Sequence, residues 1–148
     1  MRVQDILRAK ASKLVSIRYD TTLAEASRTL AREQVGMLLV VDDQRELVGL
    51  LSERDITLFL GKQEAAAARA PVSHAMSDAW IVATPEDSVT HVMKIMTEDR
   101  LRHIPVMTNG RLVGVISIGD ILKSRLAEKD QEAAVLRDLA RFSLAAAA

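Results

Sequence analysis

Apolar residues recur along the chain in two spacings, and the two spacings predict different elements. Unbroken runs of four or five apolar residues predict buried strands, whereas apolar residues three and four positions apart predict helices. In the first half this predicts a strand, a helix capped by Thr22, two strands joined by a polar turn, and a helix capped by Ser52. The corresponding ranges are 14–17, 22–34, 37–41, 47–51 and 52–60.

The second half repeats this order of strand, helix, strand, strand and helix. Pro85–Ser88 opens a helix that continues through Met96. Thr108-Asn109-Gly110 is typical of a hairpin turn, because Asn and Gly tolerate positive φ.

The two halves are also similar residue by residue. Residues 47–56 (LVGLLSERDI) and 112–121 (LVGVISIGDI) are identical at six of ten positions. The period of the repeat is 65 to 69 residues, so the chain is a tandem duplication. The other aligned segments are 38–41 with 104–107, and 3–7 with 72–76.

The repeat divides the chain into four expected parts. These are a first repeat over 1–61, an alanine-rich linker helix over 62–70, a second repeat over 71–123 and a helical extension over 124–148. Pro71 ends the linker helix, because proline disfavours helical backbone in the residue before it. Apolar residues form a stripe on the C-terminal helix, which predicts a partner surface. The stripe consists of Ile121, Leu122, Leu126, Ala133, Leu136 and Ala140.

Composition and charge narrow the class of protein. Of 148 residues, 49% are hydrophobic and 27% charged, which is typical of a folded globular chain. Lys and Arg (20) balance Asp and Glu (20), and the few aromatic residues (3%) form no stacking platform, so nucleic-acid binding is disfavoured. The absence of cysteine excludes disulfides and thiolate metal sites. No apolar run reaches the length of a signal peptide core or a membrane span, so we expect a cytoplasmic protein without membrane association.

Familiar catalytic and metal-binding patterns are missing from the sequence. The three histidines are isolated in the sequence and lack the paired spacing of metal ligands: His74, His91 and His103. Gly61-Lys62 lacks the upstream glycine of a phosphate-binding loop, and residues 114–119 have one residue too many for a nucleophile elbow. We therefore expect no metal, no catalytic cofactor and no enzyme activity.

Both copies keep one polar motif, Gly-h-h-Ser-x-x-Asp, where h is apolar. A strand runs into a helix there, so free backbone N–H groups and the hydroxyl can meet a polar ligand atom, and the carboxylate can accept both hydroxyls of a diol. In the alternative interpretation, Ser caps the helix and Asp stabilises its first turn without any ligand. The motif occurs at Gly49, Ser52 and Asp55, and again at Gly114, Ser117 and Asp120.

The two copies resemble a tandem pair of cystathionine-β-synthase-type (CBS) domains over residues 3–123, and are similar to small stand-alone bacterial CBS-pair proteins. The resemblance rests on the paired motifs, on Ile104-Pro105-Val106, on residues 38–42 and on the β-α-β-β-α order. It implies an α/β (α+β) fold in which two units pack around a pseudo-twofold axis and leave two clefts. It also implies a homodimer and an adenosine-containing ligand such as AMP, ADP, ATP, S-adenosylmethionine or NAD.

The resemblance further implies roles for single residues. The Asp of each motif would hold a ribose diol, and the Ser would lie near the ribose or the phosphate. In the first copy Arg54 stands where the second has Gly119, and its guanidinium would reach a phosphate or block the cleft. Val15 and Ile81 match positions that flank the adenine.

Residues outside the motif make the two expected clefts unequal. Arg102 and His103 match basic positions beside phosphates, whereas the first copy has uncharged residues there. We therefore expect the better nucleotide site to be the cleft of Asp120, Ser117, Arg102 and His103, with an apolar wall from residues 35–37.

Two functions remain open on the sequence. The leading interpretation is a homodimeric, non-catalytic signalling module that senses adenine nucleotides (AMP, ADP or ATP, with NAD as competitor) and acts on an effector protein. The alternative is a ligand-free scaffold or regulatory subunit that binds a partner through the C-terminal helix, 122–144. Nucleic-acid binding, a third interpretation, is disfavoured by the zero net charge.

Overall fold

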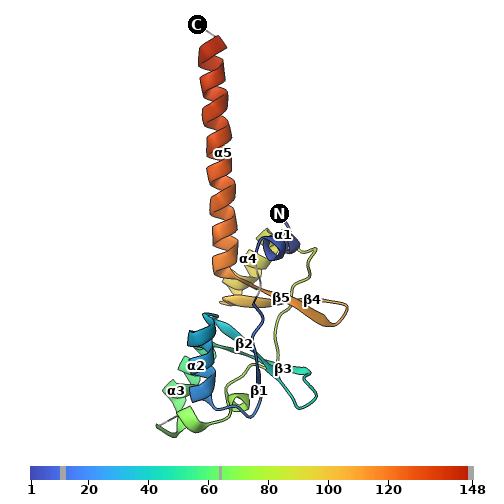
Figure 1. The fold of residues 1–148 in the computed structure, drawn as a ribbon, viewed down its shortest axis with the longest axis vertical. Helices are drawn as coiled ribbons and strands as arrows, with labels where there is room; N and C mark the ends of the chain where they lie inside the picture. The colour runs from blue at the N-terminus through green and yellow to red at the C-terminus, as the bar shows by residue number, and fades with distance from the viewer. Residues whose placement is uncertain (11–12, 64, 147–148) are drawn as a thin grey trace.

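The computed structural model describes residues 1–10, 13–63 and 65–146 as two α+β units with a long helix projecting from one of them (Figure 1). This confirms the expected fold class. Each unit combines a small sheet with helices. The elements are α1 (Val3–Ala9), β1 (Ser16–Arg18), α2 (Leu23–Glu33), β2 (Met37–Val41), β3 (Leu47–Ser52), α3 (Glu53–Lys62), η1 (Ala65–Arg69), η2 (Val72–His74), α4 (Val89–Glu98), β4 (His103–Thr108), β5 (Arg111–Ser117) and α5 (Ile118–Ala146).

The first unit is built on a three-stranded sheet in the order β1–β2–β3. β1 is parallel to β2, with Ser16 opposite Leu39, and β3 is antiparallel to β2, with Leu51 opposite Leu38. The three central residues of β2 are buried, as an unbroken apolar run predicts. The first strand begins at Ser16, two residues later than expected.

The second unit has a two-stranded sheet, β4–β5, closed by the expected turn with positive φ at Asn109 and Gly110. The prediction of a strand before this sheet is wrong. Only Ala83 pairs there, as a single parallel bridge to Val106. Pro85 lacks an N–H to continue the ladder, and its carbonyl accepts a hydrogen bond from the Gln4 backbone N–H instead (3.0 Å).

Hydroxyl side chains begin the three shorter helices of the repeats. Thr22, Ser52 and Ser88 each accept a hydrogen bond from the backbone N–H three residues later, at 3.1–3.2 Å, which confirms the predicted helix starts. The expected linker helix over 62–70 is partly wrong. α3 extends to Lys62, and Ala65–Arg69 then form a separate 3₁₀ helix, with Glu64 outside the described residues.

The segment that precedes each repeat packs in the core of the other repeat. Val3 and Ile6 of α1 are buried among residues of the second repeat, although they precede the first repeat in the sequence. Val72 of η2 is buried in the core of the first repeat. In Figure 1, α1 accordingly lies beside α4 and the base of α5. The echo between residues 3–7 and 72–76 therefore marks two equivalent segments, each completing the core of the other half.

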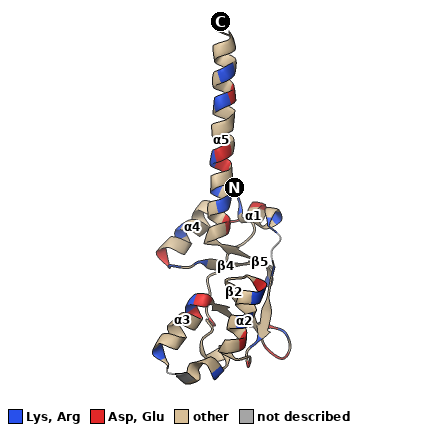
Figure 2. Ribbon diagram, turned by 60° about the vertical axis from the view of Figure 1, so that its left-hand side comes forward, with Lys and Arg blue, Asp and Glu red and all other residues tan. Residues whose placement is uncertain are grey.

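α5 continues far beyond the second unit. Ile121 is its one buried residue among those described, and charges of both signs alternate along it (Figure 2). The helix confirms the predicted C-terminal extension and leaves its apolar side chains in solvent. The exposed large apolar residues of α5 are Ile118, Leu122, Leu126, Val135, Leu136, Leu139, Phe142 and Leu144.

Candidate functional site

Two clefts lie between the units, one at each Ser-x-x-Asp motif. The Asp55 cleft has a volume of about 410 Å³, and the Asp120 cleft has a volume of about 380 Å³. Each takes its motif from one repeat and its opposite wall from the other. Gly36, Met37 and His103 line both clefts, so the clefts are neighbours across these three residues.

The motif has the same geometry in both clefts. Oδ2 of Asp55 accepts hydrogen bonds from the Ser52 backbone N–H (2.8 Å) and hydroxyl (2.7 Å), and Oδ2 of Asp120 does the same with Ser117 at the same distances. Each Asp N–H donates back to the Ser hydroxyl at 3.1 Å. These bonds confirm that Ser and Asp cap the following helix in both copies. Because these bonds use one carboxylate oxygen, Oδ1 has no hydrogen-bond partner among the described residues and can accept a ligand hydroxyl.

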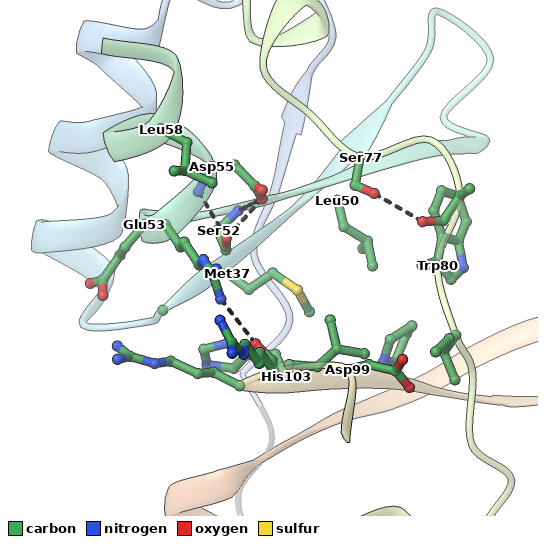
Figure 3. Close-up of a pocket in the computed structure, with 18 residues that line it drawn as sticks. Met37, Leu50, Ser52, Glu53, Asp55, Leu58, Ser77, Trp80, Asp99 and His103 are labelled. Carbon is green, nitrogen blue, oxygen red and sulfur yellow. Dashed lines mark hydrogen bonds between the residues drawn. The ribbon is translucent and has the colours of Figure 1, made fainter. Parts of the chain in front are cut away.

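The Asp55 cleft combines an apolar wall with guanidinium groups. Figure 3 shows Ser52 and Asp55 on one wall, His103 and Asp99 on the opposite wall, and the Met37 side chain extending into the space between. Trp80 stands at the far side from Asp55. The other apolar lining residues are Leu50, Leu58, Ile81, Leu101 and Pro105.

Three arginines line the Asp55 cleft: Arg54, Arg100 and Arg102. Arg54 crosses from the first repeat to the second, where its guanidinium donates to the Arg100 carbonyl oxygen (3.1 Å). Arg100 has positive φ (54°), which turns the chain just before β4. The arrangement can hold an anionic group close to the carboxylate of Asp55.

The Asp120 cleft is more polar and already contains a cation. Lys10 donates from Nζ to Oδ2 of Asp120 (2.5 Å) and to the Val115 carbonyl oxygen (3.1 Å). Burial raises the pKa of the Asp120 carboxyl, but hydrogen bonds from Lys10 and Ser117 outweigh it and hold the pKa below its usual value. Lys13 forms an ion pair with Glu33 on the opposite wall.

His103 stands between the clefts as a neutral ring. Burial, reinforced by the positive charge of Lys10, lowers the pKa of His103 below the ordinary histidine value. The imidazole packs on Gly36, where an added methyl group would lie 2.7 Å from Cε1. The lowered pKa favours the neutral imidazole, which offers one hydrogen-bond donor and one acceptor.

The structure distributes the predicted site residues between the two clefts differently from the sequence prediction. Arg102 lines the Asp55 cleft and is absent from the lining of the Asp120 cleft, so its expected grouping with Asp120 is wrong. Ile81 and Arg54 line the Asp55 cleft, and Val15 lines the Asp120 cleft. Gly119 lies outside both linings, with its nearest non-neighbouring contact at the Ser117 hydroxyl.

Sequence reasoning missed many of the lining residues, among them Lys10, Lys13, Trp80 and Arg100. Lys10 and Trp80 follow the segments 3–7 and 72–76 within four residues, and the similarity of these segments was visible. That similarity was the available signal, because it placed the residues after each segment in equivalent positions.

Within the described part of the chain, no cluster of three His, Asp or Glu side chains is arranged to hold a metal ion. Over the same residues, the helices include none with the length and apolar character needed to cross a bilayer.

Two repeated α+β units that share two clefts define a tandem regulatory module of the CBS type. The CBS domain family model matches the chain twice, over residues 3–62 and 72–127. The chain belongs to the CBS domain family and carries a CBS-domain pair.

Relatives and solved structures agree with this assignment. A CBS-domain-containing protein from Agrobacterium tumefaciens is 36% identical, with a TM-score of 0.81 over 84% of this chain and 92% of that chain. The mitochondrial CBS domain-containing protein CBSX3 of Arabidopsis thaliana is 32% identical over 117 residues, 76% of this chain. The chain spans 57% of the length of that plant protein.

Two similar structures contain ligands. A CBS domain protein from Pyrobaculum aerophilum, 28% identical with a TM-score of 0.69 over 81% of this chain and 89% of that one, is complexed with AMP. The CBS domain pair of protein MJ0100, 25% identical with a TM-score of 0.70 over 85% and 98%, is complexed with 5′-methylthioadenosine and S-adenosyl-L-methionine.

Proposed function

We propose that this CBS pair is a non-catalytic regulatory module that binds an adenosine-containing ligand, AMP in the first instance, in the Asp55 cleft. The observation that carries the proposal is the convergence of three chemistries in one space. An apolar wall, a carboxylate with a free oxygen and three guanidinium groups suit a base, a ribose diol and a phosphate. ADP, ATP and NAD share these groups and compete for the same cleft.

Each part of such a ligand has a natural place in the cleft. The adenine packs against Met37, Ile81 and Pro105, the ribose hydroxyls donate to Asp55, and the phosphate lies toward the arginines. Arg102 is the guanidinium best suited to the phosphate, since that of Arg54 already donates to the Arg100 carbonyl oxygen. The AMP and methylthioadenosine complexes of the two similar proteins support this choice of ligand class.

The Asp55 cleft replaces the Asp120 cleft as our preferred site. Sequence reasoning favoured Asp120 because it grouped Arg102 with that residue. With Arg102 in the Asp55 cleft and Lys10 bonded to Asp120, the Asp55 cleft has the freer carboxylate and the larger number of guanidinium groups. A ligand there touches both repeats, so binding favours one relative position of the two units and can change a partner-facing surface.

Calorimetric titration with AMP tests the proposed function. Replacing Asp55 with Asn keeps an oxygen that can accept the Ser52 capping bonds but removes the charge, and AMP binding is expected to weaken about 10- to 100-fold, as for loss of charged hydrogen bonds. Asp120→Asn is the matched control and should leave the tighter binding event within about threefold of wild type. Equal loss in both variants, or no binding of AMP by the wild type, would contradict the proposal.

A second function rests on a different observation, the exposed apolar residues of α5. Leu136 is 66% exposed and Phe142 is 74% exposed, which suits a scaffold that holds a partner protein or a second copy of the chain. If α5 is the binding surface, removal of residues 124–148 abolishes recovery of a partner in pull-down, with or without AMP. The same deletion should leave thermal stability nearly unchanged, because Ile121 remains. Equal recovery by the full and shortened chains would reject the helix-mediated scaffold.

A further inference from the structure

The two motifs, otherwise alike, differ in one hydrogen bond. Oδ2 of Asp120 accepts a third bond, from the Lys10 ammonium, whereas within the described residues Oδ2 of Asp55 accepts hydrogen bonds from Ser52 alone. The ammonium is anchored a second time on the Val115 carbonyl oxygen. Lys10 and Asp120 are about one quarter exposed, with side-chain values of 30% and 22%, so the pair is shielded from solvent.

The repeat identifies the counterpart of Lys10. The register that aligns residues 3–7 with 72–76 aligns Lys10 with Ala79. The structure supports this register, because Leu7 packs on Gly114 and Met76 packs on Gly49 in the same way. Ala79 lines the Asp55 cleft and places no amino group there. The Lys10 ammonium is thus present in the Asp120 cleft and has no equivalent at the matching position of the Asp55 cleft.

A cation on Asp120 changes what the cleft accepts. A ribose diol that uses both carboxylate oxygens meets the Ser bonds on Oδ2 in either cleft, but at Asp120 it also competes with the Lys10 ammonium for that oxygen. A nucleoside that displaces Lys10 from Asp120 leaves the ammonium with the Val115 carbonyl oxygen but without an anionic partner. A 5′-phosphate supplies a new anionic partner for the flexible lysine side chain, whereas a neutral nucleoside supplies none.

We propose that Lys10 is a specificity-determining residue of the Asp120 cleft: it restricts this cleft to anionic nucleotides, whereas the Asp55 cleft, with Ala79 in the equivalent position, also accepts uncharged adenosine. This inference rests on the proposed nucleotide-binding function. The remaining charges that face Lys10 agree with it, since Lys13 is already paired with Glu33 and His103 is neutral. The chain then has two unequal sensors, one for the adenosine group and one for its phosphate.

Titration of AMP and adenosine into variants of the full chain tests the assignment. In Asp55→Asn, where the Asp55 cleft is weakened, AMP should bind at least about tenfold more tightly than adenosine, as expected for a charged hydrogen bond. Adding Lys10→Met keeps the aliphatic part of the side chain and removes the ammonium. The ratio of AMP to adenosine affinity should then fall at least about fivefold, with adenosine binding becoming tighter.

The reciprocal change is the second test. Ala79→Lys in the Asp120→Asn background introduces the ammonium at an exposed position of the Asp55 cleft, and should weaken adenosine while retaining AMP. Affinity ratios that stay unchanged in both exchanges, with AMP still bound, overturn the role of Lys10 and leave the proposed function standing. Absence of AMP binding in every protein overturns both.

Discussion

Replacing Val3 with aspartate is expected to unfold the second CBS unit, although Val3 lies outside that repeat in the sequence. Its side chain is 0% exposed and packs with α4, β4, β5 and α5 residues. An unpaired buried carboxylate costs several kcal/mol, and we expect a loss of at least about 4 kcal/mol in the free energy of unfolding. Urea denaturation followed by circular dichroism measures it.

The same helix provides the control for Val3→Asp. Ala9 is exposed at the end of α1, so Ala9→Asp introduces the same charge into solvent. Its cost should stay below about 1 kcal/mol, the usual size of an unfavourable charge near a helix C-terminus. A Val3→Asp protein as stable as Ala9→Asp would mean that α1 does not belong to the core of the second unit.

The exchange of α1 and η2 explains what sequence patterns can and cannot predict. The strands β2 and β3 and the helices capped by Thr22, Ser52 and Ser88 were predictable, because each depends on residues within a few positions. The similarity of residues 3–7 to 72–76 was also visible. Which core each segment enters was not, because both cores are apolar and accept a Val at the same place.

The clefts show the same limit. Ser52, Asp55 and their copies were found because the motif encodes a strand end, a cap and a helix start within seven residues. Arg102 was grouped with Asp120 because it adjoins His103 in the sequence, but Arg102 lies in the bend before β4, where no strand alternation indicates the direction of a side chain. His103, the first residue of β4, lines both clefts, whereas Arg102 lines the Asp55 cleft. Lys10 and Trp80 lie in irregular segments, where no periodicity indicates direction.

The close packing of Met76 explains why the motif has a glycine at position 49. Gly49 is buried in β3, and a methyl group there would lie 2.9 Å from Met76 Cγ. We expect Gly49→Ala to destabilise the protein by about 1–3 kcal/mol, because the added carbon forces the segment carrying Met76 away from the sheet. Chemical denaturation gives the value, and Gly49→Val should lie at or above the upper end of that range.

A double-mutant cycle ties this cost to Met76 and not to β3 itself. Met76→Ala removes the atoms that the new methyl group meets. The loss in the free energy of unfolding of Gly49→Ala/Met76→Ala should therefore be smaller than the sum of the two single losses, by about 1 kcal/mol or more. Gly61→Ala is the control, since that helical position has open space within 4 Å and should gain about 0.4–1 kcal/mol. Strict additivity in the cycle would mean that Gly49 is required by the strand alone, and that the close approach of the η2 segment does not explain the motif.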